Sequence, residues 1–241
     1  MAAPALLELD RVSRTFGGIH AVQDVTLALR AGVTTGLIGP NGAGKTTLFN
    51  LLSGLERPDT GEIRFGGRRI DRLTPNRIAR LGIGRTFQSV RVFGALTVRE
   101  NLEVADLSAA HAAEPGREGR IDAALEVVDI TAHADAVAGR LSYGQRKLVE
   151  MAMVLVQSPR MILLDEPVAG VNPVLTDRIG EILEGLARRG HTLLIVEHNV
   201  PFVTRLCQRI IVMANGRLLA DGSAEAIQAD PRVLEVFLGG R

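Results

Sequence analysis

An eight-residue stretch from Gly39 to Thr46, with the sequence GPNGAGKT, constrains the fold of this chain more than any other segment. It fits the pattern GxxxxGK[ST], in which a glycine-rich loop between a buried strand and a helix wraps around the phosphates of a nucleotide. The flanking segments have the required patterns, since residues 33–38 form a short apolar run and residues 47–52 have the apolar spacing of a helix. The segment therefore predicts an α/β fold that binds a nucleoside triphosphate.

Each residue type in this loop has its own chemical reason. Glycines let successive backbone N–H groups turn toward an anion, because a Cβ would block the approach of phosphate. Lys45 is one of only two lysines among 28 basic residues, and its compact ammonium can sit between the β- and γ-phosphates where a planar guanidinium would not fit. Thr46 offers a hydroxyl to Mg²⁺ at the start of a helix whose dipole favours an anion. The predicted nucleotide contacts in this segment are Asn41, Gly42, Ala43, Gly44, Lys45, Thr46 and Thr47.

Two adjacent carboxylates, Asp165 and Glu166, directly follow a second apolar run at residues 161–164. Open α/β sheets bind their ligands at the carboxyl ends of the strands, so both side chains are expected beside the phosphates. Successive residues of a strand point in opposite directions. We therefore expect Asp165 to reach a Mg²⁺ ion and Glu166 to face an attacking water.

Length and composition limit the rest of the molecule. With 241 residues, of which 46% are apolar, the chain can bury one sizeable core or two closely joined lobes. The net charge of +1 does not suggest a nucleic-acid surface, and we interpret the ten arginines between Arg57 and Arg99 as a solvated face. The single cysteine, Cys207, is interpreted as a small buried hydrophobic residue, which fits a reducing cytosolic setting.

No apolar run approaches the ~18 residues of a membrane span. Residues 1–9 also lack the basic start and the long apolar stretch of a secretory signal. We therefore expect this chain to stay outside the bilayer.

The order of the predicted elements indicates a strand-rich beginning, a helical middle and an alternating end. Residues 6–29 predict an antiparallel ribbon that turns at a Gly-Gly pair. Residues 121–128 and 142–157 have helical spacing, whereas residues 108–119 are expected to form an exposed loop or helix junction without a catalytic residue. The apolar run at 192–196, like the one before the paired carboxylates, predicts a parallel strand covered by helices on both faces.

A further segment, Leu141 to Gln145 with the sequence LSYGQ, lies about twenty residues before Asp165. On its own, the Ser-x-x-Gln spacing predicts an ordinary capping box at the start of a helix. In this place along the chain it is similar to the signature motif of ATP-binding-cassette (ABC) proteins, usually written LSGGQ, with Tyr143 replacing the first glycine. A serine hydroxyl, a glycine N–H and a helix N-terminus form a second anion-binding surface, so Ser142, Gly144 and Gln145 are expected to hold a phosphate between two copies of the chain.

The remaining landmarks of the ABC family follow in order, so the resemblance covers essentially the whole chain. It implies that Gln88 senses metal and water, that His198 contacts the γ-phosphate, and that Phe16 and Val22 contact the nucleotide, with the Phe16 ring on adenine. Core packing of the ribbon is the alternative for Phe16. In the loop from Ala169 to Pro173, Asn172 replaces the aspartate that is more common in the family. The implied catalytic residues are Glu166, His198, Gln88 and Lys45, and the implied metal contacts are Thr46, Gln88 and Asp165.

These motifs together resemble those of the ATP-binding subunits of importers for branched-chain amino acids or related amides and urea, although the stretch after Leu102 is short for one of their two ATPase subunits. The resemblance implies an α/β fold of the ABC-type P-loop ATPases, with a RecA-like core, an N-terminal antiparallel β subdomain and a helical subdomain. Residues 1–241 would then form a single domain. Within it, residues 1–87 and 159–241 are expected to form the catalytic core with the β subdomain, and residues 88–158 the helical signature subdomain.

The resemblance also implies an activity, cofactors and partners. It predicts an ATPase that uses ATP and Mg²⁺ and that couples dimer closure and hydrolysis to solute transport by separate membrane subunits. The expected partners are integral-membrane permease subunits, a second ATP-binding subunit that is identical or related, and, indirectly, a periplasmic solute-binding protein, with no nucleic acid. The expected location is the cytoplasmic face of the inner (cell) membrane.

Two other functional classes share some of these motifs. A soluble ABC ATPase acting on DNA or ribosomes is the first alternative, but no sustained heptad run separates Gly44 from Leu141 and the chain contains one cassette. A phosphoryl-transferring kinase is the second, but the glutamate after Asp165 and the signature before it point to water as the acceptor.

Overall fold

The computed structural model describes residues 5–238, which form strands and helices in the order β-rich, helical, then alternating. The strands are β1 (Ala5–Phe16), β2 (Ile19–Arg30), β3 (Thr34–Ile38), β4 (Thr60–Phe65), β5 (Arg68–Arg69), β6 (Ile83–Arg85), β7 (Met161–Asp165), β8 (Thr192–Val196), β9 (Arg209–Ala214) and β10 (Arg217–Gly222). The helices are α1 (Lys45–Leu52), α2 (Pro75–Arg80), α3 (Val98–Ser108), α4 (Arg117–Val127), α5 (Tyr143–Leu155), α6 (Pro173–Arg188), α7 (Val200–Leu206), α8 (Ala224–Gln228) and α9 (Pro231–Leu238), with short 3₁₀ turns at Thr131–His133 and Ala138–Arg140.

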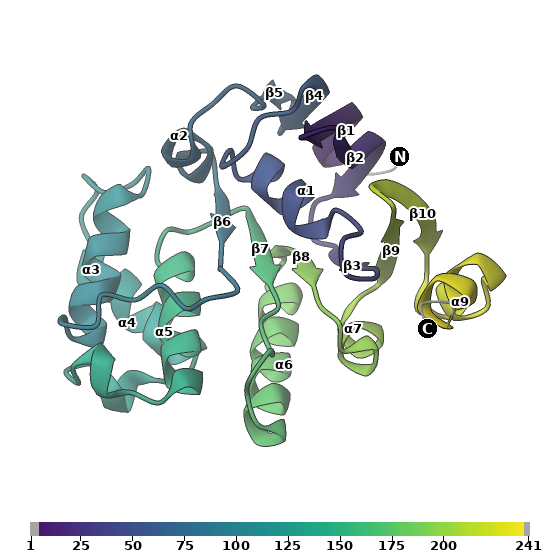
Figure 1. The fold of residues 1–241 in the computed structure, drawn as a ribbon. Helices are drawn as coiled ribbons and strands as arrows, with labels where there is room; N and C mark the ends of the chain where they lie inside the picture. Colours follow the sequence, from purple (N-terminus) through teal and green to yellow (C-terminus); the bar gives the residue numbers. More distant parts are fainter. Residues whose placement is uncertain (1–4, 239–241) are drawn as a thin grey trace.

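Two sheets organise the described part of the chain (Figure 1). The larger sheet has the strand order β10-β9-β3-β8-β7-β6, and its pairs are parallel except for β9 with β10. The smaller sheet, β2-β1-β4-β5, is antiparallel and contains the ribbon that the sequence predicts over residues 6–29. The α/β class with an antiparallel β subdomain and a group of helices is therefore confirmed.

Alternate residues of the central strands face two different hydrophobic cores. In β7, Met161 and Leu163 contribute to one core, whereas Ile162 and Leu164 contribute to the other. The first core lies between the two sheets and is filled by α1 and by β1, β2 and β4, as the position of α1 in Figure 1 shows. The second core is covered by helices, α6 and α7 among them. Helices thus lie on both faces, as expected, but on one face α1 shares the cover with the antiparallel sheet, which the apolar runs did not predict.

Helices α3, α4 and α5 lie together at one side of the molecule (Figure 1). Helix α5 contacts α3 and α4 on one side and strand β6 on the other. The three helices share one continuous hydrophobic cluster with a face of the larger sheet, so the boundaries at 87/88 and 158/159 remain a prediction.

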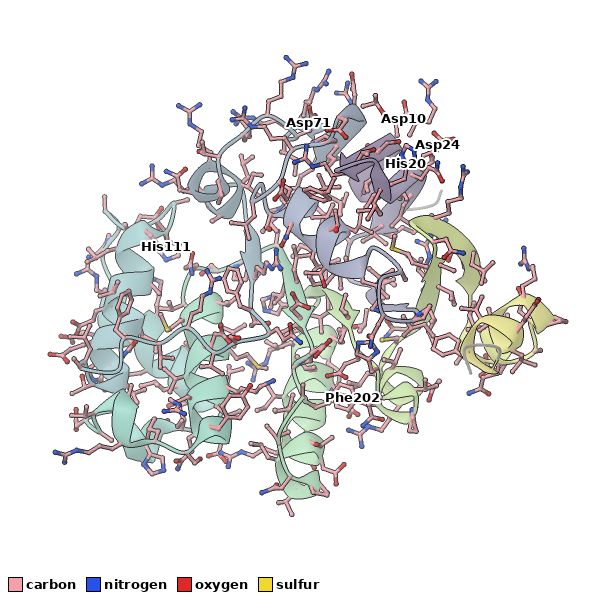
Figure 2. The ribbon with its side chains drawn as sticks, in the orientation of Figure 1. Asp10, His20, Asp24, Asp71, His111 and Phe202 are labelled. Carbon is pink, nitrogen blue, oxygen red and sulfur yellow. The ribbon has the colours of Figure 1, made fainter. Side chains whose placement is uncertain are left out.

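The connection between α3 and α4 is held in place by a buried carboxylate. Asp106 has a fully buried side chain, and it accepts hydrogen bonds from Arg117 and Arg120 and lies 3.1 Å from Nε2 of His111. Figure 2 places His111 at the end of α3. Three cationic or hydrogen-bonding groups around one buried acid therefore tie this short connection to the helices.

None of the helices within residues 5–238 combines the length and the apolar character needed to cross a bilayer.

Candidate functional site

The predicted site residues meet at one edge of the larger sheet. Strands β3, β8, β7 and β6 are neighbours there, and they lead respectively into the loop 39–46, His198, Glu166 and the segment with Gln88. The carboxyl ends of parallel strands share an edge, and this edge is where open α/β sheets bind ligands. The sheet order therefore assembles four segments that are far apart in the sequence.

At two positions of the loop 39–46, Gly44 and Gly42, the backbone conformation is one that favours glycine. Gly44 has a φ of +99°, and a Cβ there would lie 2.2 Å from the carbonyl oxygen of Ala21 on β2. Gly42 has a φ of +78°, and a Cβ there would meet no atom within 4 Å. The first glycine lets the loop pack against the ribbon, and the second leaves room for an anion beside the loop. Of the other predicted contacts, Ala43 and Lys45 are buried, Thr47 is half-buried, and Asn41 and Thr46 are exposed.

Lys45 is held inside the loop that precedes it. Its Nζ donates hydrogen bonds to the carbonyl oxygens of Gly39 at 2.7 Å and Pro40 at 2.9 Å. Burial lowers the pKa of the ammonium, while the carboxylates of Glu166 and Asp165 act in the opposite direction. The two acids that follow β7 are therefore close enough to influence the lysine of the phosphate loop.

Asp165 forms a buried ion pair with Arg85 that the sequence analysis did not predict. The Nη2 of Arg85 lies 3.0 Å from Oδ2 of Asp165, and both side chains are only 7% exposed. Nη1 of the same arginine donates to Asn50 and to Ser53, each at 2.8 Å, at the end of α1. Burial raises the pKa of Asp165 and the charge of Arg85 opposes that shift. The interpretation of all ten arginines as a solvated face is therefore wrong for Arg85, because this residue lies on strand β6 and its side chain is buried.

Glu166 lies between Gln88 and His198. Its Oε2 accepts a hydrogen bond from Nε2 of Gln88 at 3.0 Å, and its Oε1 lies 3.1 Å from Nε2 of His198. Its backbone is in the left-handed region with a φ of +49°, and its N–H donates to the carbonyl oxygen of Val196 on β8 at 2.9 Å. A left-handed conformation is costly for a residue with a side chain and is maintained only when the surroundings impose it. Three separately predicted residues are thus brought into direct contact.

The ribbon places Phe16 and Val22 in opposite environments. Phe16 ends β1, and its ring is 41% exposed, with the guanidinium of Arg14 4.5 Å from the ring centroid. The alternative of core packing for Phe16 is therefore excluded. Val22 is fully buried in the core between the two sheets. Its side chain has no surface with which to contact a nucleotide.

The segment 141–145 begins helix α5. Ser142 and Gln145 form the predicted capping box, with the Ser142 side chain accepting from the Gln145 N–H and the Gln145 side chain accepting from the Ser142 N–H. Nε2 of Gln145 also lies 2.9 Å from Nε2 of His133. Within residues 5–238, the side-chain hydrogen bonds of Ser142 and Gln145 join these two residues to each other and Gln145 to His133, and none reaches the loop 39–46.

Helix α6 packs closely against this segment. A Cβ on Gly144 would lie 2.1 Å from Cδ2 of Leu175, so only a glycine leaves this packing undisturbed. Asn172 caps α6 by accepting a hydrogen bond from the N–H of Leu175 at 2.9 Å. Aspartate and asparagine cap helices about equally well, so the departure from the more common aspartate preserves this local role. Tyr143, the departure in the signature, occupies the first position of α5 and is 38% exposed.

Three charged residues around the site were missed by the sequence analysis. Lys147, the second lysine of the chain, donates to the carbonyl oxygens of Glu166 and Pro167. Its rarity in an arginine-rich chain is the same signal that singled out Lys45. Glu150 and Glu197 are buried acids that accept hydrogen bonds from backbone N–H groups near Gln88 and His198 respectively.

A signal in the sequence could have found Glu150. It lies among apolar residues of a helix predicted from its apolar spacing, and an acid in such a position is buried only if it has partners. The sequence does not say what those partners are. They lie 63 and 59 residues away, at Phe87 and Arg91.

Comparison with known families gives two matches. Residues 22–169, more than half of the chain, match the family described as ABC transporter. Residues 217–241 match the family described as branched-chain amino acid ATP-binding cassette transporter.

Similar proteins span almost the whole chain. The high-affinity branched-chain amino acid transport ATP-binding protein BraF of Pseudomonas aeruginosa is 38% identical over 249 aligned residues, covering 97% of this chain and 98% of that protein. The LivG protein of Salmonella typhimurium, which bears the same description, has the same identity and coverage. The solved structure of MJ1267, an ATP-binding cassette of an ABC transporter in its ADP conformation, superposes with a TM-score of 0.88 at 31% identity, covering 98% of this chain and 99% of that one. A dimeric structure of the ATP-binding cassette MJ0796 bound to ADP and Pi has a TM-score of 0.81 at 25% identity, covering 90% of this chain and 98% of that one.

Proposed function

This chain belongs to the ABC transporter family of ATP-binding proteins, and from that premise we propose that it hydrolyses ATP to drive the import of branched-chain amino acids or similar solutes. The observation that carries the proposal is the placement of Glu166, whose carboxylate lies between Gln88 and His198, directly after Asp165 and at the sheet edge that holds the phosphate loop. The named relatives are transport proteins, which argues against the alternatives of a nucleic-acid ATPase or a kinase.

The reaction is attack of water on the γ-phosphorus of ATP, with cleavage of the bond to the β-phosphate oxygen and release of ADP and phosphate. Glu166 accepts a hydrogen bond from the attacking water and orients it, and Gln88 and His198 hold that carboxylate in place. Lys45 exchanges its bonds to the loop carbonyls for bonds to phosphate oxygens. Phe16, which is exposed at the end of β1, stacks on the adenine.

The donors at this edge fit a Mg²⁺ ion. Thr46 supplies a hydroxyl, Asp165 a carboxylate and Gln88 an amide oxygen, and hard oxygen ligands are what Mg²⁺ prefers. Residues 5–238 contain no group of three or more acidic, histidine or cysteine side chains that would cage a metal. This agrees with Mg²⁺, which is commonly held by one or two carboxylates together with substrate phosphates. When bound, the ion would neutralise charge that develops on the phosphate oxygens.

A complete site is proposed to need a second ATP-binding subunit. Ser142, Gly144 and Gln145 lie at the N-terminus of α5, where a helix end favours an anion, yet within the described residues their side chains form no hydrogen bond with the phosphate loop of their own chain. The related cassette MJ0796 is described as dimeric in a post-hydrolysis state. We therefore assign these residues to the nucleotide of a partner, which is an identical or a related chain.

Transport further requires permease subunits in the membrane, and we propose that this chain binds them at the cytoplasmic face of the cell membrane. A groove of about 370 Å³ next to Gln88 is suited to such a contact, because it is open and lies between the segment 89–94 and the start of α5. Phe93 in this segment is 50% exposed, and an exposed aromatic is typical of a protein contact surface. A periplasmic solute-binding protein would act through these subunits without touching this chain.

The first experiment replaces Glu166 by Gln, which keeps the shape of the side chain and removes its charge. We expect ATP to bind with unchanged affinity and hydrolysis to fall by at least a hundredfold, because general base and orienting groups contribute about that much or more. Glu126→Gln, a change of an exposed glutamate on α4, is the matched control and should leave both quantities unchanged. Hydrolysis near the normal rate by the Glu166 variant would remove Glu166 from its proposed role.

The second experiment tests the shared site. A Ser142→Arg protomer mixed with a Glu166→Gln protomer forms one dimer site in which both defects combine and one in which neither is present. The mixture should therefore regain hydrolysis that each variant lacks alone. Complete absence of activity in the mixture would contradict sharing between subunits.

A further inference from the structure

Helix α5 lies between the helical group and the catalytic edge of the sheet. It starts at the signature residues, and it packs on α3 and α4 on one side and on strand β6 on the other. Its inner face carries two buried charged residues, Lys147 and Glu150, each only 6% exposed. They are three residues apart and therefore lie on the same face of the helix.

Glu150 holds the segment around Gln88. Its Oε1 accepts hydrogen bonds from the backbone N–H of Phe87 at 3.2 Å and of Arg91 at 3.3 Å. These two donors lie on either side of Gln88 in the sequence, so one carboxylate oxygen fixes both ends of the segment that contains this glutamine. A buried N–H left without a partner costs about 1–3 kcal/mol, so the carboxylate strongly favours this conformation.

Lys147 holds the segment after Asp165. Its Nζ donates to the carbonyl oxygen of Glu166 at 2.8 Å and to that of Pro167 at 3.2 Å. The backbone of Glu166 is thereby connected to α5, while its side chain is bonded to Gln88 at 3.0 Å. The contacts form a closed ring that runs from Glu150 to the backbone that flanks Gln88, from the Gln88 side chain to Glu166, from Glu166 to Lys147, and back along the helix.

We infer that Glu150 and Lys147 are positioning residues through which helix α5 sets the placement of Gln88 and Glu166 relative to each other within one subunit. The inference rests on the proposed function, since it concerns the geometry of that same site. Any displacement of α5, such as one caused by a nucleotide of the partner subunit at Ser142, moves both residues of the catalytic pair together. Neither Glu150 nor Lys147 touches the substrate.

The test uses two substitutions of Glu150 that separate the effect of side-chain length from the effect of charge. Glu150→Gln keeps the length of the side chain and an oxygen acceptor but loses the charge, whereas Glu150→Asp keeps the charge and is one methylene shorter. We expect E150D to lower kcat at least tenfold with the Kd for ATP changed less than twofold, because small misplacements of catalytic groups are costly. E150Q should keep kcat within threefold of the wild type. Glu126→Asp and Glu126→Gln on α4 are the matched controls, since Glu126 is exposed.

A structural readout accompanies the kinetics. Hydrogen exchange of the amides of Phe87 and Arg91 should become at least tenfold faster in E150D and stay near the wild-type rate in E150Q. Lys147→Met should lower kcat to a similar extent with normal exchange at these two amides, because it acts on the segment after Asp165. These measurements are made on folded protein, and exchange elsewhere in α1 and β7 should be unchanged.

Three outcomes would overturn the inference. The first is wild-type kcat and wild-type exchange in E150D. The second is a large loss of kcat in E150Q with kcat near the wild-type value in E150D, which would mean that the charge of Glu150 matters and the length of its side chain does not. The third is a fall in ATP affinity as large as the fall in kcat, which would indicate a general structural role. If the wild-type chain does not hydrolyse ATP, or if Glu166→Gln does, the proposed function itself fails, and these results are distinct from the first three.

Discussion

Disrupting the buried ion pair between Arg85 and Asp165 is the strongest test of which contacts stabilise this site. Replacing Arg85 by Met keeps a long apolar side chain and removes the guanidinium. Asp165 is then left buried without its counter-charge, and the side chains of Asn50 and Ser53 lose their common donor. We expect a large loss of stability in the nucleotide-free protein.

The magnitude follows from the burial of both partners. Breaking a buried ion pair by removing one partner costs about 3–5 kcal/mol, because an uncompensated charge remains inside. The whole stability of a domain is about 5–15 kcal/mol, so R85M should lose a large fraction of it. At about 2–4 °C per kcal/mol for a chain of this size, Tm should fall by roughly 10 °C.

Urea denaturation of four proteins measures the effect: wild type, R85M, Asp165→Asn and the double variant. The double variant should be less destabilised than the sum of the single variants by about 2 kcal/mol, because neutralising Asp165 removes the stranded charge. Arg64→Met is the control, since Arg64 is solvent-accessible and forms an exposed ion pair with Glu62 and a long hydrogen bond to the Gly67 carbonyl, so the variant should lose less than about 1 kcal/mol.

The pH dependence gives a further check on the same pair. Burial raises the pKa of Asp165, and loss of Arg85 raises it further. A carboxyl whose folded pKa lies above its unfolded value loses stability as pH rises through that window, so the deficit of R85M should grow with pH. A deficit below 1 kcal/mol, or strict additivity in the double variant, would refute the reasoning.

Three more predictions concern single residues. Burial raises the pKa of Glu150 to about 7, well above the ordinary value of a glutamate, so near neutral pH the folded protein binds more protons than the unfolded chain and loses stability as pH rises. The stability of wild type relative to E150Q should therefore fall by about 3 kcal/mol from pH 5 to pH 8, and a constant difference in urea titrations would contradict this. Phe16→Ala should weaken ATP binding about tenfold with little change in kcat, because one aromatic stack is worth roughly 1–3 kcal/mol. Binding titrations decide, with Ile19→Ala, a change of a more exposed apolar residue in the same hairpin, as control, and unchanged affinity would remove Phe16 from the nucleotide contact. Asn172→Ala should lower the free energy of unfolding by about 1 kcal/mol, because the alanine cannot accept the hydrogen bond from Leu175 that caps α6. Asn172→Asp should leave this free energy near the wild-type value, and equal effects of the two changes would argue against the cap.

The motifs could be predicted because their chemistry is local. A glycine-rich loop followed by lysine and threonine needs only a strand before it and a helix after it, and the apolar runs show both. The two carboxylates after β7 follow from the same reasoning, because ligands bind at the carboxyl ends of strands. For the capping box at Ser142, the spacing alone was sufficient.

The resemblance to the ABC family supplied what local chemistry could not. A glutamine in a loop and a histidine after a strand carry no signal of their own, and Gln88 and His198 became candidates only through their order among the other motifs. The same route proposed Val22, and there the structure shows a buried side chain. A family position indicates where the backbone runs, but solvent exposure depends on packing in this chain.

By itself, then, the sequence determined the class of fold, the phosphate loop and the acidic pair, because each depends on residues that are neighbours along the chain. The tertiary structure alone decided which distant partners these groups have. Arg85 meets Asp165 across 80 positions, and Glu150 meets Phe87 across 63. The physical reason is that alternation in a strand specifies that a side chain is buried, whereas the order of strands in the sheet, with β8 between β3 and β7, specifies what it is buried against.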